Sequence, residues 1–411
     1  MQTSMTLAAP SRLTAPSLPL AVAFAIAPAA SVLQSRAIAP IATIALALCI
    51  LAHRRRTGAW PWPRGAAFRA AIALLAWAAL TALWAIEPLR ALGTPLQIGG
   101  FVVLGAMAAR AMTEEDEAAR HRLLLAAAGG LVAGLALAGL DLGTGHAVRA
   151  AVRGLREPTP MLAFGLKPAA SAMGLWLPLV AAAGIAAWLR GTVLLAGAAL
   201  LVLLPGEAAK IAVLAGGLAG GLALLAPRLV PRLLGAALAL SILAMPVALG
   251  PVLARGLPAD GIPPSAAHRL LIWDFVTDRI AERPILGWGM ESSRAIPGHR
   301  DHPAPEALDR FRLAGPGTPP WLPVAQLLPL HPHNMALQIW LELGLPGALL
   351  AAALALLLGQ AAARSRWPAV ATAALAAATV TGMLSFGAWQ EWWVGAELMA
   401  LAAVAGLPRR G

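Results

Sequence analysis

The sequence predicts an all-α integral membrane protein with about 12 transmembrane helices. Of its 411 residues, 59% are hydrophobic and only 12% are charged, and the mean hydropathy is +0.74. Soluble domains carry about 25% charged residues. Several apolar runs also approach the roughly 20 residues that one bilayer crossing requires. These observations indicate that lipid surrounds most of the chain.

Twelve apolar runs are separated by charged or turn-forming residues. Pro205 and Gly206, with Glu207 and Lys210, divide two runs that could otherwise be read as one. The layout predicts an N-terminal bundle of about nine spans (1–252), a large loop (253–332) and a C-terminal bundle of about three spans (333–411). The expected spans are 17–34, 37–52, 68–86, 94–112, 122–142, 169–188, 191–205, 210–226, 232–252, 333–358, 368–387 and 393–408.

Arginines predict the orientation of these spans. They concentrate in every second connection and in the C-terminal pair Arg409-Arg410, and such an excess marks the cytoplasmic side. Both termini are then cytoplasmic, and the loop 253–332 faces outward. Orientation also explains the net charge of +12 better than nucleic-acid binding does. With only Arg12 ahead of it, the first run fits a membrane helix better than a cleaved signal peptide. Cys49 is the only cysteine, so an internal disulfide is excluded.

The segment 253–332 is too long to be only a connector, because loops of that length are usually functional or disordered. Apolar residues recur at helical spacing from Ala266 to Arg283, with Ser265 as a plausible N-cap and Pro284 as the stop. We therefore expect short helices inside this loop. The stretch Pro284–Gly289 predicts a turn, and its glycines could let backbone approach a ligand.

His333, at the end of this loop, is the leading candidate for a general base, because imidazole accepts protons near neutral pH. On a straight helix it would share a face with Leu337, Gly344 and Gly347, whereas Glu342 would lie on the other side. A histidine that caps a membrane helix is an equally good explanation. Pro346 predicts a kink, since it removes the hydrogen bond to the carbonyl of residue 342.

Arg269 could bind a phosphate through its guanidinium, and Trp273 follows one turn later on the same face. An interfacial helix with an anchoring Trp and an extended Arg explains the pair more simply. We expect Arg149, Arg153 and Arg156 in a short outward connection. The positive-inside rule disfavours them there, so either an anionic substrate or simple solvation must account for them.

Other polar residues also have two possible roles, one structural and one in substrate binding. Lys210 either contacts substrate or pairs with Glu207 at the i, i+3 spacing. Trp389, with Trp392 and Trp393, is expected at the outer membrane edge as an aromatic belt, although Trp rings also stack on sugars. Phosphate-binding P-loops, paired cysteines and His-Glu-x-x-His motifs are absent from the sequence. No Asp-x-Asp pair follows the first span, so the usual acidic ligands of a metal-held sugar donor are missing and no metal is expected.

These motifs resemble the O-antigen ligase and O-antigen polymerase superfamily of bacterial membrane glycosyltransferases. His333-Asn334, nine residues, Gly344, two residues and Gly347 reproduce the superfamily pattern His-(Asn/Ser/Gln)-x9-Gly-x2-(Gly/Thr/Tyr). Arg269-x3-Trp273, followed by Pro284-x2-Gly287-x-Gly289, resembles the region that precedes the motif. Trp389-Gln-Glu-Trp-Trp393 resembles a Trp-rich loop of some members. The resemblance covers nearly the whole chain in layout and about 266–350 in sequence.

The resemblance implies a GT-C-like fold in the bacterial inner membrane, with its active site in the periplasm. It implies metal-independent transfer, with no cofactor, of a glycan from undecaprenyl diphosphate to a sugar hydroxyl. His333 would be the general base, and Arg269 would bind the diphosphate. The substrate-binding residues would be Arg149, Arg153, Arg156, Lys210, Asn334, Trp273 and Trp389. Many members carry Ser-Arg or similar near Glu207–Lys210, and Lys210 would replace that arginine as a charge but not as a bidentate fork.

Three functions remain open from sequence. The first is an O-antigen ligase that uses lipid A–core as acceptor. The second is a polymerase of lipid-linked repeat units for O-antigen or exopolysaccharide. The third is a solute transporter of the bicarbonate type, against which the scarcity of charges within spans argues. The short chain and the compact His-Asn motif favour the ligase slightly.

Overall fold

The structure is a computed structural model that describes residues 15–408. Every regular element in this range is helical, so no strand occurs among the described residues. Arg12 and Arg409-Arg410 lie outside the range. The α-helices are α1 (Ser17–Leu33), α2 (Ile38–Thr57), α3 (Ala66–Leu80), α4 (Pro88–Thr113), α5 (Glu117–Gly143), α6 (Ala147–Val152), α7 (Leu166–Trp176), α8 (Ala187–Leu203), α9 (Glu207–Leu225), α10 (Val230–Arg255), α11 (Pro264–Glu282), α12 (Pro305–Arg310), α13 (Met335–Ala363), α14 (Pro368–Leu384) and α15 (Glu391–Ala405). Short 3-10 turns include η4 (Pro160–Gly165), η5 (Leu177–Ala182) and η6 (Ser292–Arg294).

Eight helical segments in the described range are long and apolar enough to cross a membrane. They contain α2, α3, α4, α5, α7, α9, α10 and α13, and α1, α8 and α14 are shorter apolar helices. This composition fits an integral membrane protein. The predicted break at Pro205-Gly206 is confirmed, because α8 ends at Leu203 and α9 begins at Glu207. The count of 12 spans and their orientation remain predictions.

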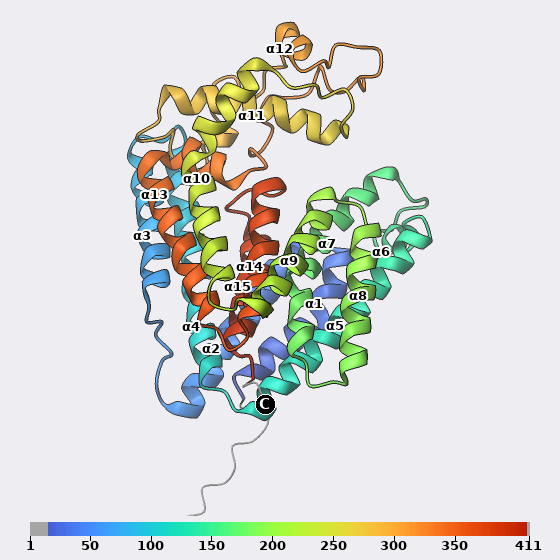
Figure 1. Ribbon diagram of the computed structural model, residues 1–411, viewed down its shortest axis with the longest axis vertical. Coiled ribbons are helices and arrows are strands. Elements are labelled where there is room, and N and C mark those ends of the chain that lie inside the picture. The colour runs from blue at the N-terminus through green and yellow to red at the C-terminus, as the bar shows by residue number, and fades with distance from the viewer. Residues whose placement is uncertain (1–14, 409–411) are drawn as a thin grey trace, which may run out of the picture.

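The helices form an elongated bundle, with α11 and α12 at one end, beyond α10 and α13 (Figure 1). The C-terminal end of α15 lies at the opposite end. Long-range packing joins α10 to α13, α1 to α5, α9 to α14 and α4 to α15. Glycine permits the close contact of α10 with α13: a Cβ atom on Gly235 would lie 2.9 Å from the Cα of Gly359. Small residues commonly allow membrane helices to pack so closely.

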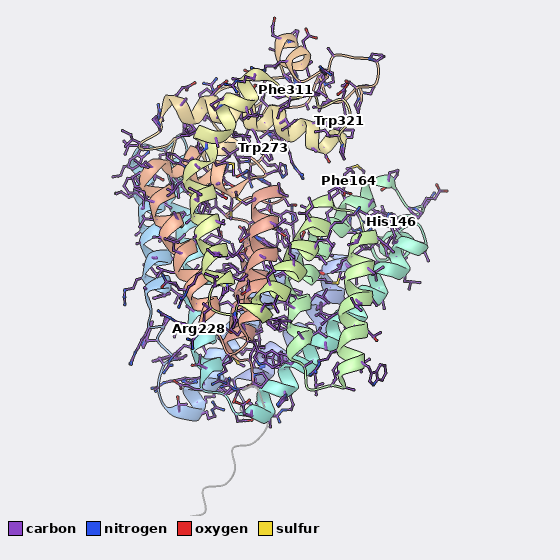
Figure 2. The ribbon with its side chains drawn as sticks, in the orientation of Figure 1. His146, Phe164, Arg228, Trp273, Phe311 and Trp321 are labelled. Carbon is purple, nitrogen blue, oxygen red and sulfur yellow. The ribbon has the colours of Figure 1, made fainter. Side chains whose placement is uncertain are left out.

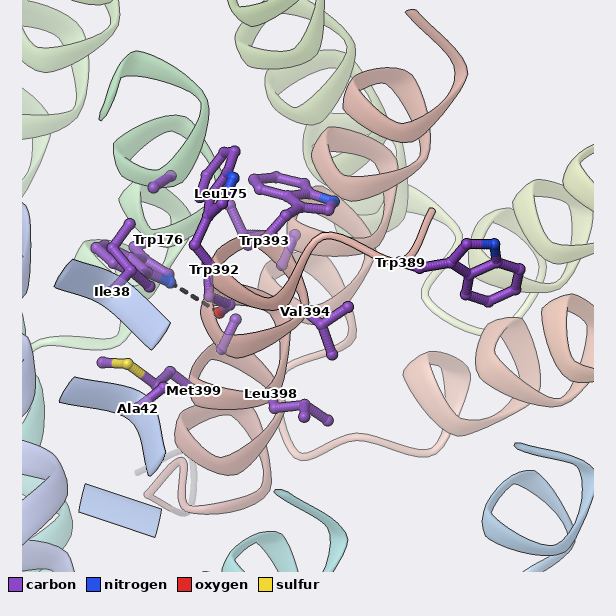
Figure 3. Packing of buried hydrophobic residues seen from close by; sticks show 14 of the residues in the cluster. Ile38, Ala42, Leu175, Trp176, Trp389, Trp392, Trp393, Val394, Leu398 and Met399 are labelled. Carbon is purple, nitrogen blue, oxygen red and sulfur yellow. Dashed lines mark hydrogen bonds between the residues drawn. The ribbon is translucent and has the colours of Figure 1, made fainter. Parts of the chain in front are cut away.

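The Trp-rich stretch 389–393, at the start of α15, lies inside the protein, so the expected aromatic belt is wrong. Trp389 and Trp392 are each 9% exposed and Trp393 is 3% exposed. The Trp392 and Trp393 rings pack against Phe386, with ring centroids 4.7 and 5.8 Å away. Figure 3 shows the two tryptophan rings at the upper end of α15. The tertiary fold buries aromatic area here that the local sequence would leave to lipid.

The long segment between α10 and α13 contains short helices, as predicted, and α11 coincides closely with the expected helix. Ser265 as N-cap is wrong. The helix begins at Pro264, its N-cap residue is Pro263, and no side chain caps it. Proline at the first helical position suits this start, because its missing N–H would have no intrahelical partner and its φ is already helical.

Candidate active site

His333 lies immediately before α13, at the end of the bundle where α11 packs. Its φ is +56°, in the left-handed region that non-glycine residues seldom adopt. Asn334 is the N-cap, and its Oδ1 accepts hydrogen bonds from the backbone N–H groups of Ala336 and Leu337. The shared helical face that we predicted for His333, Leu337 and the glycines is therefore wrong: His333 is outside the helix, and Gly344 interrupts α13.

The His333 ring is held in one tautomer. Its Nδ1 donates a hydrogen bond to the backbone carbonyl of Ser385. A carbonyl oxygen can only accept, so Nδ1 carries the proton and Nε2 keeps its lone pair. Burial lowers the pKa of His333 to about 4, partly opposed by the Ser385 carbonyl. The ring is neutral at pH 7 and has one nitrogen available as a base.

Two neighbours hold the His333 backbone. His331 accepts a hydrogen bond at Nδ1 from the N–H of His333 over 3.2 Å, and the two rings pack edge to face with centroids 4.3 Å apart. Trp273 donates from its indole nitrogen to the carbonyl of Pro332 over 2.8 Å. This bond ties α11 to the histidine segment. Trp273 thus positions the loop.

Arg269 brings an unpaired positive charge to the same region. It precedes Trp273 by one turn of α11, and its charge lowers the pKa of His333 further, as do His268 and Lys167. Within residues 15–408 Arg269 makes no hydrogen bond and no ion pair. Burial lowers its own pKa, although an arginine remains charged at pH 7. A partly desolvated guanidinium without a counter-ion is a natural place for an anion.

Lys167 is a second cation near His333, and it was not among the site residues predicted from the sequence. It lies in the first turn of α7, with its ammonium 4.4 Å from the Phe164 ring centroid, and the described part of the chain offers it no ion pair. Figure 2 shows Phe164 at the same end of the molecule as Trp273. A signal was available, because Lys167 is one of two lysines and lies in the connection 143–168. Gly206 packs on its side chain, where an added Cβ would lie 3.3 Å from Cγ.

The three arginines predicted in the connection 143–168 differ in burial and in their partners. Arg149 is fully buried, and its Nε lies 2.7 Å from the Asp141 carboxylate, which differs from the exposed position that we expected. Arg153 is exposed and reaches the carbonyl of Leu33 at 3.4 Å, and Arg156 is exposed. The side chains of Arg149 and Arg153 lie beside Gly165, two residues before Lys167. Arg149 therefore holds the segment that leads to Lys167.

Lys210 forms the ion pair with Glu207 that was the simpler of the two expectations for it. Its ammonium lies 2.8 Å from the carboxylate of Glu207, three residues earlier in α9. This pair is at the start of α9, next to the glycine that packs on Lys167. Its positive charge is therefore already matched by a neighbouring carboxylate.

Glu342 does not contact His333, as predicted, but it is the centre of a buried hydrogen-bond network. One oxygen accepts from the Ser293 hydroxyl and, over 3.1 Å, from the Gln338 amide. The other accepts from the N–H of Glu291 over 3.0 Å and from the Trp389 indole over 2.8 Å. Four donors from three separate segments therefore meet on one carboxylate. Trp389 contributes to the scaffold through this bond.

The turn 284–289 docks into a break in α13, and the break explains why both segments contain glycines. Gly344 has φ 61° and ψ −160°, and Pro346 follows it. The carbonyls of Leu341 and Glu342 consequently accept from the N–H groups of Trp288 (2.8 Å) and Gly289 (2.9 Å). A Cβ on Gly287 would lie 2.7 Å from the Glu342 carbonyl oxygen. The two glycine motifs therefore build one backbone junction beneath the site.

Clusters of three or more His, Cys, Asp or Glu side chains arranged to hold a metal are not found in the range 15–408. The groups that gather around His333 are cations instead. They suit an anionic ligand, which Arg269 and Lys167 could contact from two different helices.

Comparison with known proteins finds a family to which one segment of the chain is similar. Residues 179–352 match the family model described as O-antigen ligase. A polysaccharide ligase, so named provisionally, from Rickettsia conorii is 39% identical over 141 residues, which are 34% of this chain and 31% of that protein. The corresponding protein of Rickettsia bellii is 35% identical over 164 residues, 39% of this chain and 37% of that protein. The aligned part thus spans about one third of these relatives. No solved structure matches.

Fold and site together define a helical membrane protein with a neutral histidine beside unpaired cations. The match covers α8 to the middle of α13, including Arg269, His333 and both glycine motifs. Residues 179–352 are therefore similar to the O-antigen ligase family.

Proposed function

We propose that this protein transfers a glycan from undecaprenyl diphosphate to a sugar hydroxyl, with lipid A–core as the acceptor. One observation carries the proposal: a neutral histidine with a free Nε2 lies among two cations, Arg269 and Lys167, that make no ion pair within the described chain. A base and an anion site in one place are what displacement of a diphosphate requires.

The chemistry follows from these groups. Nε2 of His333 takes the proton of the acceptor hydroxyl while that oxygen attacks the anomeric carbon of the donor glycan. The bond from this carbon to the diphosphate oxygen breaks, and undecaprenyl diphosphate leaves with the electron pair. Arg269 and Lys167 stabilise the negative charge that develops on the leaving group. The imidazolium then loses its proton to solvent, which restores the base.

The remaining predicted residues have secondary parts in this proposal. Asn334, Trp273 and Trp389 position the segments that carry the site, because the Asn334 Oδ1 and the two indole nitrogens are engaged in hydrogen bonds within the protein. The exposed Arg153 and Arg156 could meet outer parts of an anionic donor. Two cations supply the positive charge that a metal would otherwise provide, so we propose transfer without metal or cofactor.

We propose that the site faces the periplasm of a bacterial inner membrane. The alternation of arginines along the sequence supports this orientation. A donor on that side must arrive already activated, because nucleotide sugars are cytoplasmic; a lipid diphosphate meets this need. The segment 253–332, with α11 and α12, would then be the periplasmic loop between the bundles 1–252 and 333–411.

Deletion of the gene, followed by analysis of glycolipids and lipid-linked intermediates, tests the proposal. Loss of a ligase leaves long polymer on undecaprenyl diphosphate and bare lipid A–core. Loss of a polymerase of the same superfamily leaves single repeat units. Unchanged glycans together with altered bicarbonate uptake would refute both transfer reactions and favour the transporter.

A further inference from the structure

A polar cavity of about 240 Å³ lies next to His331, on a different set of residues from the cations around His333. Segments far apart in the sequence enclose it: the start of α4, the η6 region, α13 and the stretch before α15. Its lining includes Thr94, Arg294, His331, Glu342, Trp389 and Gln390. The proposed transfer mechanism assigns it no role.

The charges of the cavity exclude a diphosphate. Both arginines in the lining already have carboxylate partners: Arg90 is 2.8 Å from Glu87, and Arg294 is 3.1 Å from Glu291. Glu342 and Glu391 add further carboxylates to the lining. A dianion would meet repulsion here, whereas it meets unpaired cations beside His333. An uncharged ligand with many hydroxyls suits the mixture of donors and acceptors.

Gln390 has a polar atom that lacks a partner. As placed, its Oε1 is buried without a hydrogen bond, and its Nε2 lies 3.2 Å from Nε2 of His331. Because Nδ1 of His331 accepts from the N–H of His333, the neutral ring carries its proton on Nε2. Two donors would then face each other, so the amide fits better when turned by 180°. In that orientation Gln390 accepts from His331, and its NH₂ group has no partner.

An unsatisfied buried amide is costly, and each such group in a native protein needs an explanation. A ligand hydroxyl that accepts from the Gln390 amide would supply the missing bond. Trp389 contributes an aromatic wall, since its indole nitrogen is already bonded to Glu342. Aromatic walls with a few convergent polar groups are typical of small-molecule sites.

We propose that this cavity binds an uncharged sugar unit of the acceptor glycan. The proposal rests on the transferase function above and names the place where the acceptor is held. The donor diphosphate occupies the side of Arg269 and Lys167. The cavity adjoins His331, whose ring packs on that of His333, so an acceptor anchored there directs its neighbouring sugar toward the base.

Substitution Thr94→Phe tests the proposal by filling the cavity from α4, where the Thr94 side chain is outside the hydrogen-bond network described above. Thr318→Phe makes the same change in a second cavity, between residues 259 and 322. Both variants are purified in nanodiscs. Transfer is measured with lipid-linked glycan and rough lipopolysaccharide extracted from the deletion strain. Thr94→Phe should raise KM for the lipopolysaccharide about tenfold or more, the effect of one lost hydrogen bond of about 1.4 kcal/mol. Its donor KM and kcat should be unchanged.

Binding without donor separates this proposal from the transferase function. The core oligosaccharide released from that lipopolysaccharide should bind the wild type and Thr318→Phe equally in calorimetry, and Thr94→Phe about tenfold more weakly. Equal binding by all three proteins, or none by the wild type, overturns the acceptor cavity even if transfer occurs. Binding that depends on Thr94 supports the cavity even if no transfer is detected, in which case only the transferase proposal fails. Equal thermal unfolding of the variants confirms that they are folded.

Discussion

Glu342 and Arg269 are two charged groups near the same histidine, and the protein treats them in opposite ways. The carboxylate of Glu342 is fully buried and accepts hydrogen bonds from four donors. Arg269 is partly desolvated and has no partner within residues 15–408. A charged group whose hydrogen-bonding atoms all have partners in the protein stabilises the native structure, whereas one without partners is available to a ligand. The difference separates the scaffold of this site from its reactive part.

The largest effect is expected at the base. His333→Ala should lower the rate of glycan transfer by about 10²–10⁴, the usual contribution of general base catalysis. Thermal unfolding should occur at a somewhat lower temperature, because the Ser385 carbonyl loses its donor, but the Asn334 cap remains and the protein should fold. Transfer is measured with the extracted donor and acceptor. His299→Ala, which alters another loop histidine, is the control and should retain full activity. An active His333→Ala enzyme would remove the base from the mechanism.

A smaller loss is expected at the unpaired cations. Arg269→Ala should lower kcat by about 10²–10³, a typical cost of removing one stabilising donor from a developing negative charge. Arg269→Lys should restore part of the rate, because it keeps the charge but not the bidentate fork. Lys167→Ala should behave like a milder Arg269→Ala. If Lys167→Ala and Arg300→Ala, an exposed loop control, have the same rate as wild type, Lys167 does not belong to the site.

Substitution of Glu342 should change the stability of the fold, in contrast to the substitutions of Arg269 and Lys167, which should change the rate of transfer. Glu342→Ala leaves the buried donors of Ser293, Gln338 and Trp389 without their acceptor, and should destabilise the fold by about 3 kcal/mol or more. Glu342→Gln should cost less, since it keeps one acceptor oxygen. Thermal unfolding in nanodiscs measures both. Were Glu342→Ala as stable as the wild type but inactive, Glu342 would belong to the reactive part and the contrast with Arg269 would fail.

The smallest effect is the pH dependence. Burial lowers the pKa of His333 to about 4 from an ordinary value of 6.5. Its neutral form is the active one, so kcat/KM should stay constant from pH 7 to about pH 5 and fall as the pH passes through 4. Because the unfolded chain binds this proton more readily, stability is also lost as the pH falls from 6.5 toward 4. A fall in kcat/KM already centred near pH 6.5 would show that the ring is not desolvated.

Several features of the site were predictable because local sequence encodes them. The 266–283 helix, the turn at Pro284 and the break at Pro205-Gly206 follow from periodicity and from proline and glycine positions. His333 and Arg269 were accessible through the motif spacing. The face shared by His333 and Gly344 was not, because the helix starts after His333 and is interrupted at Gly344. Predicting a shared face from spacing assumes an unbroken helix, and this helix is broken.

Composition and short motifs by themselves predicted a helical membrane protein and which histidine is the candidate base. Those properties depend on residue type and on spacings of a few positions. Only the tertiary structure decided which charges are paired. Asp141 forms an ion pair with Arg149 from eight residues away, whereas Lys167 forms no ion pair in the described chain. Glu342 collects donors from residues 291–293 and 389. Partners of a buried charge come from segments that folding brings together, so their identity cannot be read from either segment alone.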